Sequence, residues 1–353
     1  MKRIALFLPN WVGDAVMATP AVRALRECFP AFHIVGVGKP YISGVFDGSP
    51  WLDEWVPCDP RGPASQHLLP VAARLRKDPI DLAVLFPNSF RSALAAWLGR
   101  CRRRIGYARY GRSWLLTDRL QPVRDFHGRI KPNSALAAYN RLAEQVGCSR
   151  PSNRMELFTT SAGETLAERV WRKFGLDRFA EVVCLNPGAA FGSAKLWPAD
   201  YFAWLARQLT ERRGSGILIL CGPAERELAR RIAGAAKCPG VYSLADEPVS
   251  LELTKACIQR ADLLVSTDSG PRHFAAALNR PVVALFGPTH IAWTQTHYSQ
   301  EIQLQESVPC GPCQQRVCHL DHRCMTQLLP QEVFDAAATL LERRQKEDVR
   351  HAG

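Results

Sequence analysis

The sequence predicts an α/β protein with two doubly wound domains, each a parallel sheet covered by helices on both faces. Short, near-continuous apolar runs alternate with stretches of helical periodicity, which is typical of parallel strands buried on both faces. This rhythm occurs once in each half of the chain, and 353 residues are enough for two domains of ordinary size.

The first half contains three expected strands and three expected helices. The strands are Ile4–Leu8, His33–Val37 and Asp81–Phe86, and the helices are about Ala15–Cys28, Ser89–Leu98 and Asn133–Val146. The first helix begins after Asp14 and ends before Pro30, which has no N–H with which to continue it.

The second half repeats the pattern with four strands and five helices. The strands are Val182–Asn186, Gly216–Cys221, Leu263–Ser266 and Val282–Phe286. The helices are Ala162–Phe174, Ala199–Arg213, Ala224–Ala235, Leu251–Gln259 and Arg272–Leu278. We expect the domain boundary between Gly175 and Glu181, which gives domains at 1–177 and 178–330. The remaining residues, 331–353, are expected to form a helix as far as Lys346 and then a frayed tail.

Composition places the chain among globular proteins, with 47% apolar and 22% charged residues. No apolar run approaches the roughly 18 residues that a membrane span needs. The N-terminal apolar run Ile4–Leu8 stops at Pro9 and no small-residue cleavage site follows, so it is interpreted as a buried strand and not a signal peptide. We therefore expect a cytoplasmic protein.

The net charge of +12 is concentrated in one segment, 91–131, which holds eleven Lys or Arg residues and two Asp. Such a segment is either a solvated basic face or a surface for an anionic partner. The candidates are a phosphorylated glycolipid, a membrane surface and a nucleic acid.

Five loops follow expected strands, where open parallel sheets bind ligands. They are Pro9–Thr19, Pro187–Trp197, Gly222–Glu225, Thr267–His273 and Gly287–His290. One loop belongs to the first half and four to the second. This distribution predicts a cleft between the domains, with a nucleotide bound mostly by the second.

The loop Thr267–His273 follows an apolar strand and opens a helix, whose unpaired N–H groups attract phosphate. Gly270 permits close backbone approach, Ser269 has a hydroxyl to donate, and Asp268 either caps the helix or holds a hydroxyl of a ribose or sugar. The alternative for the whole loop is a simple N-cap with a turn glycine.

Two further strand-end side chains are candidates for nucleotide binding. Lys195 follows a small-residue loop and can neutralise a diphosphate leaving group, unless it is an ordinary surface lysine. Glu225 can accept hydrogen bonds from ribose hydroxyls, or merely favour a helix N-terminus. Neither Gly-x-x-x-x-Gly-Lys-Ser/Thr nor an early Gly-x-Gly-x-x-Gly occurs, which disfavours kinase-type loops and nicotinamide dehydrogenases.

Asp14 follows the first strand, where Gly13 is expected to form a turn. Asp14 is either an N-terminal cap or a general base that faces the cleft and removes a proton from an acceptor hydroxyl. A carboxylate is basic enough for this step because the bond to the departing diphosphate is already weak.

Together these residues resemble glycosyltransferase family 9, the lipopolysaccharide heptosyltransferases. The resemblance rests on Asn10–Arg26, Asn186–Pro198, Leu263–Leu278 and Arg280–Thr289. It implies a GT-B fold, with two Rossmann-like domains facing a central cleft. It also implies inverting transfer of heptose from ADP-L-glycero-D-manno-heptose to the heptosyl-Kdo inner core of lipid A-linked lipopolysaccharide.

The resemblance assigns roles to individual residues. Asp14 matches the family's base. The residues that it implies for donor binding are Lys195, Glu225, Thr267, Asp268, Ser269, Gly270 and His273. No tightly bound metal is implied, because helix ends and the lysine stabilise the diphosphate. The sequence departs from the pattern at Pro271 and Arg272, and Arg272 is expected to add positive charge near the phosphates.

The acceptor side is expected around Asp14 and the basic segment. The acceptor-binding candidates are Gly13, Thr19, Arg102, Arg103 and Arg104. The expected partners are ADP-heptose, the lipopolysaccharide acceptor and, through peripheral contact, the cytoplasmic face of the inner membrane. Nucleic acid is not an expected partner.

Four cysteines, Cys310, Cys313, Cys318 and Cys324, cluster near the end of the second domain. They are ligands of a structural zinc, reduced or paired cysteines that pack a long loop, or a functional cluster. The spacing differs from that of two-knuckle zinc ribbons, and a bound metal would hold the loop without taking part in transfer.

Other functions stay open at this point. One is a GT-B glycosyltransferase or epimerase that uses a different nucleotide sugar. A remote one is a basic nucleic-acid-binding protein with a zinc module, which predicts salt-dependent binding but leaves the strand-end loops unexplained.

Overall fold

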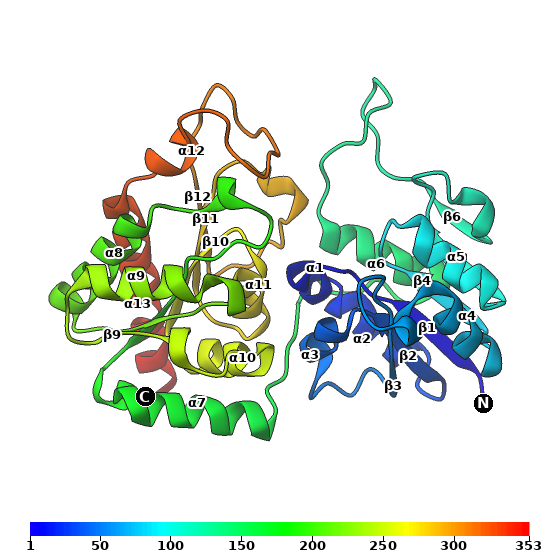
Figure 1. The fold of residues 1–353 in the computed structure, drawn as a ribbon, viewed down its shortest axis with the longest axis horizontal. Helices are drawn as coiled ribbons and strands as arrows, with labels where there is room; N and C mark the ends of the chain where they lie inside the picture. Colours follow the sequence, from blue (N-terminus) through cyan, green and yellow to red (C-terminus); the bar gives the residue numbers. More distant parts are fainter. Residues whose placement is uncertain (353) are drawn as a thin grey trace. The chain divides into compact units, whose positions relative to one another are not determined.

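The computed structural model describes residues 1–352, with side chains up to residue 346, as two compact units. Unit 1 comprises Met1–Phe158 and the short segment Ala292–Thr296, and unit 2 comprises Thr159–Ile291 and the chain from His297 on. Each unit contains a six-stranded sheet (Figure 1) whose strand pairs are all parallel. The predicted α/β class with two doubly wound sheets is confirmed.

The unit 1 sheet has the strand order β3-β2-β1-β4-β5-β6. The strands are β1 (Arg3–Phe7), β2 (His33–Gly38), β3 (Glu54–Pro57), β4 (Leu82–Leu85), β5 (Arg103–Tyr107) and β6 (Asp118–Leu120). The helices are α1 (Val12–Met17), α2 (Thr19–Cys28), α3 (Ser43–Phe46), α4 (Leu68–Lys77), α5 (Phe90–Leu98) and α6 (Ala135–Val146).

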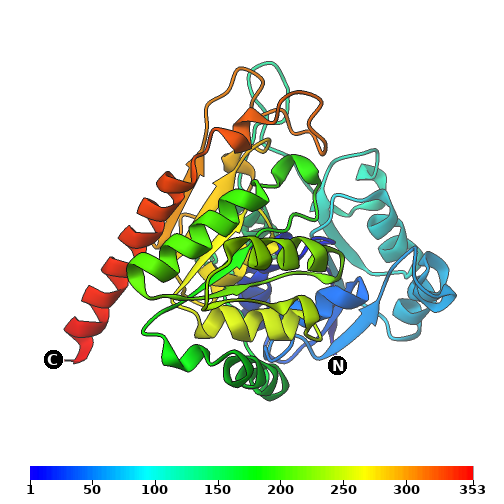
Figure 2. The same ribbon diagram turned by 60° about the vertical axis from the view of Figure 1, so that its left-hand side comes forward.

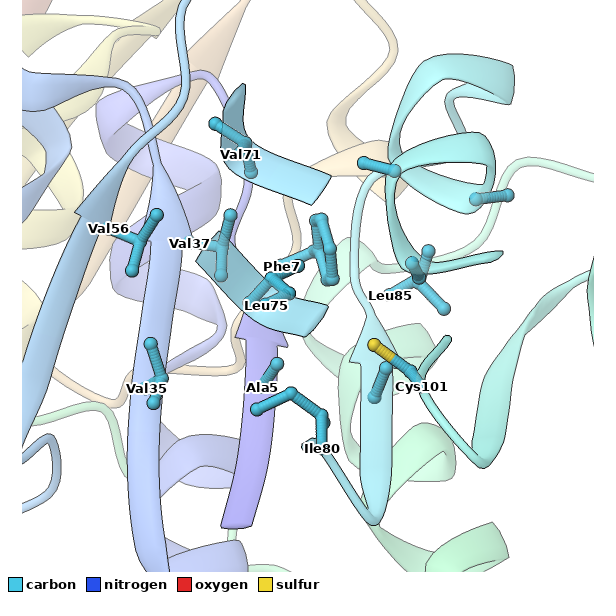
Figure 3. Packing of buried hydrophobic residues seen from close by; sticks show 14 of the residues in the cluster. Ala5, Phe7, Val35, Val37, Val56, Val71, Leu75, Ile80, Leu85 and Cys101 are labelled. Atoms are coloured by element: carbon cyan, nitrogen blue, oxygen red, sulfur yellow. The ribbon is translucent and has the colours of Figure 1, made fainter. Parts of the chain in front are cut away.

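Alternate strand residues of this sheet form an apolar core under α4 and α5. Ala5 and Phe7 of β1 lie beside Val35 and Val37 of β2, and Leu75 of α4 packs over them (Figure 3). Their near-complete burial supplies most of the stabilisation of this layer, at about 25 cal/mol for each Å² of apolar surface removed from water. The core fixes the sheet from which the unit 1 loops project.

The sequence did not indicate three of these strands. The edge strand β3 is short and only Val56 is buried, while the three-residue β6 buries only Leu120. The inner strand β5 begins with Arg103 and Arg104, which are only partly buried. Without a continuous apolar run, the pattern that identifies buried parallel strands is missing.

The expected helix Ala15–Cys28 is two helices that meet at Ala18. Pro20 has no N–H to donate to the carbonyl of Val16. The hydroxyl of Thr19 donates to that carbonyl instead, at 2.8 Å, so the chain turns without leaving it unpaired.

The unit 2 sheet has the order β12-β11-β10-β7-β8-β9. The strands are β7 (Val182–Asn186), β8 (Gly216–Ile219), β9 (Val241–Ser243), β10 (Leu263–Thr267), β11 (Val282–Phe286) and β12 (Glu301–Gln305). The helices are α7 (Ser161–Phe174), α8 (Ala199–Arg213), α9 (Arg226–Ala236), α10 (Leu251–Arg260), α11 (Gly270–Ala277), α12 (Arg323–Thr326) and α13 (Pro330–Ala352). The long α13 packs along α8 (Figure 2), and the bounds of β7, β11 and α8 are those predicted.

Helix α7 belongs to unit 2, although it precedes the boundary expected between Gly175 and Glu181. It packs against α10, where Arg260 bridges to Glu164 and Glu168. At the other end, α13 continues past Lys346, and the frayed tail expected at 347–353 lies outside the residues whose side chains are described. None of the described helices is both long and apolar enough to cross a membrane.

Candidate active site

Loops that follow four strands of unit 2 are joined by hydrogen bonds at the carboxyl edge of the sheet. The hydroxyl of Thr267, at the end of β10, donates to the carbonyl of Gly188 after β7, at 2.6 Å. The amide of Asn186 donates to the Ser269 hydroxyl at 2.9 Å. Gln305, at the end of β12, donates to the carbonyl of Thr289 after β11, at 2.9 Å. Segments far apart in sequence therefore form one site.

Asp268 is the centre of this site and is only 4% exposed. The Lys195 ammonium donates to Asp268 Oδ2 at 2.5 Å and to its backbone carbonyl at 2.8 Å. The Arg272 guanidinium donates to Oδ1 at 3.1 Å, and the Thr289 hydroxyl donates to Oδ2 at 2.7 Å. Asp268 is thus an internal counter-ion, and it does not cap α11, whose N-cap is Ser269.

Burial and charge set the protonation of this cluster. Burial raises the pKa of the Asp268 carboxyl, but the charges of Lys195 and Arg272 outweigh it and lower the pKa to about 2. His273 is 3% exposed, and burial followed by the Arg272 charge lowers its pKa well below the usual 6.5. At neutral pH the carboxylate is therefore ionised and the imidazole is neutral.

Arg272 does not supply the free positive charge that the sequence led us to expect near the phosphates. It is 1% exposed, and its Nε donates to Glu301 of β12 at 2.5 Å while Nη1 contacts Asp268. Its guanidinium also lies 4.9 Å from the centre of the Phe286 ring. The charge is balanced inside unit 2, where it joins the start of α11 to the sheet.

The start of α11 keeps backbone donors available to a ligand. No side chain caps it, because the Ser269 hydroxyl accepts from Asn186 and donates to the carbonyl of Thr267. Gly270 opens the helix and Pro271 occupies its first turn. An uncapped helix start attracts an anion through its unpaired N–H groups and the helix dipole.

Lys195 adds a further hydrogen-bond donor to this helix start. An ammonium has three N–H donors, and the two contacts with Asp268 use two of them. The ammonium also lies 4.9 Å from the centre of the Phe191 ring. A third donor is left for a phosphate oxygen, as the sequence interpretation of Lys195 requires.

Glu225 stabilises the turn before α9 and leaves one carboxylate oxygen for a ligand. Its Oε2 accepts from the backbone N–H of Gly222 at 2.8 Å, which fixes the start of the turn before α9. Its carboxylate lies against Gly188, where a Cβ would come within 2.1 Å of it. Oε1 has no hydrogen-bond partner among the described residues and can accept from a ribose hydroxyl.

In unit 1, Asp14 lies in the first turn of α1, after β1. Gly13 is the second residue of that helix and has no positive φ, so it does not form the expected turn. Burial and then the charge of Asp14 raise the pKa of Tyr139 on α6, which indicates that the phenol lies close to the carboxylate. Tyr139 packs edge-on against Phe86, and nothing in its helical sequence context indicated this position.

The model of glycosyltransferase family 9 (heptosyltransferase) matches residues 69–323. The chain belongs to this family. It is 27% identical to lipooligosaccharide heptosyltransferase 2 of Campylobacter jejuni, over 96% of this chain and 98% of that protein. It is 28% identical to lipopolysaccharide heptosyltransferase 2 of Escherichia coli, over 96% of this chain and 98% of that protein. The solved structure of E. coli ADP-heptose lipopolysaccharide heptosyltransferase II is 25% identical, with a TM-score of 0.80 over 98% of this chain and 100% of that one.

Membership of family 9 makes the chain a glycosyltransferase and accounts for the strand-end loops, which nucleic-acid binding leaves unexplained. The same fold in the solved heptosyltransferase confirms the expected GT-B class.

In this family 9 member, the segment 306–324 carries the four clustered cysteines and is called the cysteine loop. It contacts the turn that carries Lys195. His322 contacts the carbonyl of Ala194 at 2.8 Å, and the N–H of Ala194 donates to the carbonyl of Arg316 at 3.0 Å. At Gly192, a Cβ would lie 2.3 Å from the same carbonyl oxygen, so the two segments approach closely. The loop therefore supports the turn of Lys195 from outside the sheet.

The four clustered cysteines line a cavity of about 410 Å³ beside Ala194. All four are free thiols. Burial, then the neighbouring thiols Cys318, Cys313 and Cys310, raise the pKa of Cys324 to about 11. Across the described part of the chain, no group of three or more His, Cys, Asp or Glu side chains is arranged to hold a metal ion, so the geometry adds no support for the zinc hypothesis.

The hydroxyl of Thr19 is not available to an acceptor substrate. Thr19 is 0% exposed, and besides donating to Val16 its oxygen accepts from the N–H of Glu156 at 3.2 Å. The hydroxyl instead fixes the junction of α1 and α2 to the segment that ends unit 1.

Arg102, Arg103 and Arg104 lie at the amino end of β5, whereas Asp14 follows the carboxyl end of β1. The strand register shows that these arginines lie at the amino edge, since Arg103 of β5 and Ile4, near the start of β1, both align with Leu82 of β4. Arg102 pairs with Asp81 at 3.2 Å, Arg103 with Asp118 at 3.0 Å, and Arg104 donates to backbone carbonyls. The structure does not bring these arginines together with Asp14.

Basic side chains do gather at the carboxyl edge of unit 1, at positions that the sequence analysis did not single out. Arg109, Lys131 and Arg141 line a small cavity of about 60 Å³ with Tyr107 and Trp293. Arg109 follows β5, and Trp293 comes from the short segment that returns to unit 1. Only the fold joins three positions so far apart in sequence.

Proposed function

We propose that this chain transfers heptose, with inversion, from ADP-L-glycero-D-manno-heptose to the heptosyl-Kdo inner core of lipid A-linked lipopolysaccharide. The supporting observation is the Lys195 ammonium, held by buried Asp268 beside the uncapped start of α11, in a member of family 9. The similarity to E. coli ADP-heptose lipopolysaccharide heptosyltransferase II supports the same donor and a lipopolysaccharide acceptor.

The donor half of the reaction uses unit 2. The third donor of Lys195 and the N–H groups that open α11 bind the diphosphate of ADP-heptose, and Glu225 Oε1 accepts from its ribose. When the anomeric bond breaks, negative charge develops on the departing ADP. A positive charge that is already fixed in place stabilises this charge without reorganisation.

The acceptor half uses Asp14 as general base. Its carboxylate takes the proton of an acceptor hydroxyl as that oxygen bonds to the anomeric carbon on the face opposite ADP. Attack from the opposite face inverts the anomeric configuration. Arg109, Lys131 and Arg141 are suitably placed, at the carboxyl edge of unit 1, to bind an anionic group of the acceptor.

The reaction as proposed needs no metal, because Lys195 and the α11 start supply the positive charge. Transfer should therefore continue in the presence of a strong chelator. Metal analysis of the purified protein shows whether zinc occupies the cysteine loop. If it does, removing the zinc should loosen the turn around Ala194 and lower donor affinity.

We place the reaction at the cytoplasmic face of the inner membrane, where a lipid-linked acceptor is reached by peripheral contact. The test is incubation of the purified protein with ADP-heptose and truncated lipopolysaccharide that ends in heptosyl-Kdo. Mass spectrometry should show the acceptor gaining one heptosyl residue. Transfer from a UDP- or GDP-sugar in place of ADP-heptose would overturn the donor assignment.

A further inference from the structure

We propose that unit 1 docks on anionic lipid bilayers through an aromatic–arginine surface formed by Phe90, Trp97, Trp114, Arg91 and Arg100. The inference rests on the proposed function only in that the proposed acceptor is a lipid. It concerns a surface outside the residues assigned to chemistry.

The three aromatic side chains form one exposed cluster. Phe90 and Trp97 lie on α5, and Trp114 lies on the short turn Ser113–Leu115 before β6. They are 41%, 45% and 60% exposed. The Trp114 ring centre lies 6.2 Å from that of Phe90 and 6.1 Å from that of Trp97. Single exposed apolar residues are ordinary, but contiguous ones indicate a contact surface.

A buried arginine holds this cluster in shape. Arg112 is 0% exposed, and its guanidinium donates to the carbonyls of Tyr107 and Pro87 and to the side chain of Asn88. Burial, then the charge of Arg109, lowers the pKa of Arg112 to about 10, so it is still charged at neutral pH. These bonds tie the turn that carries Trp114 to the loop that begins α5. The rings are therefore presented by ordered backbone.

The charge around the cluster favours an anionic partner. Arg91 follows Phe90 at the start of α5 and Arg100 lies just beyond its end; both are exposed, and no carboxylate pairs with either among the described residues. The Arg104 guanidinium also lies nearby, since it donates to the carbonyl of Leu115, next to Trp114. Tryptophan rings favour the headgroup level of a bilayer, and basic residues near an anionic surface each contribute about 1 kcal/mol.

The position of the surface fits a bilayer better than the reacting sugar. Helix α5 follows β4 and precedes β5, so it runs from the carboxyl edge of the parallel sheet towards the amino edge (Figure 1). Trp97 and Arg100 lie at its far end, away from the edge that carries Asp14. An extended lipid surface can contact the whole length of such a helix.

The test is co-sedimentation of the full chain with two kinds of vesicle, phosphatidylcholine alone and phosphatidylcholine with phosphatidylglycerol. The wild type should bind the anionic vesicles preferentially and lose binding at high salt. The variants are W97Q/W114Q and R91E/R100E, with L329Q, a 51% exposed leucine of unit 2, as the control. Each arginine lost should weaken binding at least about fivefold, from about 1 kcal/mol per basic residue. L329Q should bind like the wild type.

Two further measurements keep the proposal separate from the proposed function. Brominated lipids should quench the tryptophan fluorescence of the wild type more than that of W97Q/W114Q, whether or not heptose transfer is observed. In transfer assays, W97Q/W114Q should raise KM for acceptor embedded in anionic vesicles and leave KM for deacylated, water-soluble acceptor unchanged. Equal binding of wild type and variants to anionic vesicles would overturn the proposal. A raised KM for the soluble acceptor would instead assign the rings to sugar binding.

Discussion

The carboxyl edges of the two sheets are built in different ways. In unit 2, the ligand-facing loops are joined by buried charges that are paired with one another, with Asp268, Lys195 and Arg272 at most 8% exposed. In unit 1, Asp14 is only partly buried, and the basic residues at the same edge line a small cavity.

This difference agrees with the proposed division of roles, in which unit 2 binds the donor and unit 1 carries the general base. A network of buried pairs is costly to rearrange, because each charge would lose its partner in a medium of low dielectric. Unit 2 is therefore preformed for one charged ligand. The exposed edge of unit 1 suits a large acceptor and a base that must exchange its proton with water.

The largest effect should come from Asp14→Asn, which tests whether unit 1 carries the chemistry. Loss of a general base should lower the transfer rate about 10²–10⁴-fold. ADP binding, measured by calorimetry, should stay the same because unit 2 is unchanged. Glu27→Gln, at an exposed carboxylate of α2, is the matched control. A D14N protein with full activity would remove Asp14 from the mechanism.

The second effect tests whether unit 2 depends on its buried pairs. Arg272→Met leaves Glu301 buried without its partner and should destabilise unit 2 by about 3–5 kcal/mol in urea unfolding. The double variant Arg272→Met/Glu301→Gln should recover part of this loss, since the unpaired charge is gone.

Arg323→Met is the control for that series, because Arg323 pairs with Asp321 on the surface. An exposed pair contributes about 0–1 kcal/mol. Equal destabilisation by Arg272→Met and Arg323→Met would contradict the contrast between the two edges.

Acid should weaken unit 2 in two steps. The pKa of His273 is lowered in the fold, so below pH 6.5 the unfolded chain takes up a proton that the folded chain does not, and stability falls. The pKa of Asp268 falls from 3.8 to about 2, so its stabilisation, about 2 kcal/mol, is present above pH 3.8 and lost as the pH drops towards 2. Unfolding free energies across this range measure both steps. His273→Gln should remove the first one, whereas replacing the exposed His127 should not.

The smallest effect distinguishes the two edges of the unit 1 sheet. Arg109→Glu, at the carboxyl edge, should raise acceptor KM about fivefold, from roughly 1 kcal/mol for a partly exposed charge. Arg102→Glu, at the amino edge, should leave the KM of a soluble acceptor nearly unchanged, and donor KM should be the same in both. A larger effect at Arg102 than at Arg109 would restore Arg102–Arg104 as the acceptor site.

Strands that are continuous apolar runs, and the loops after them, could be predicted from the sequence. β7 and β11 are continuous apolar runs, and the loop from Thr267 to Gly270 follows such a run and opens a helix as expected. Strand β5 could not be predicted because it begins with two arginines. Arg102–Arg104 were therefore assigned to an acceptor site, although they begin a strand at the opposite edge of the sheet.

By itself, the sequence determined the alternation of strands and helices, the two-sheet class and the strand ends at which ligands bind. These depend on local periodicity and on the rule that parallel strands share a carboxyl edge. Only the tertiary structure decided that Arg272 is neutralised by Glu301 and that Tyr139 lies near Asp14. It also decided that Trp114 joins Phe90 and Trp97 on one surface. These contacts join residues from separate elements. Which side chain pairs with a charge or packs against a ring depends on tertiary packing, and local sequence does not encode it.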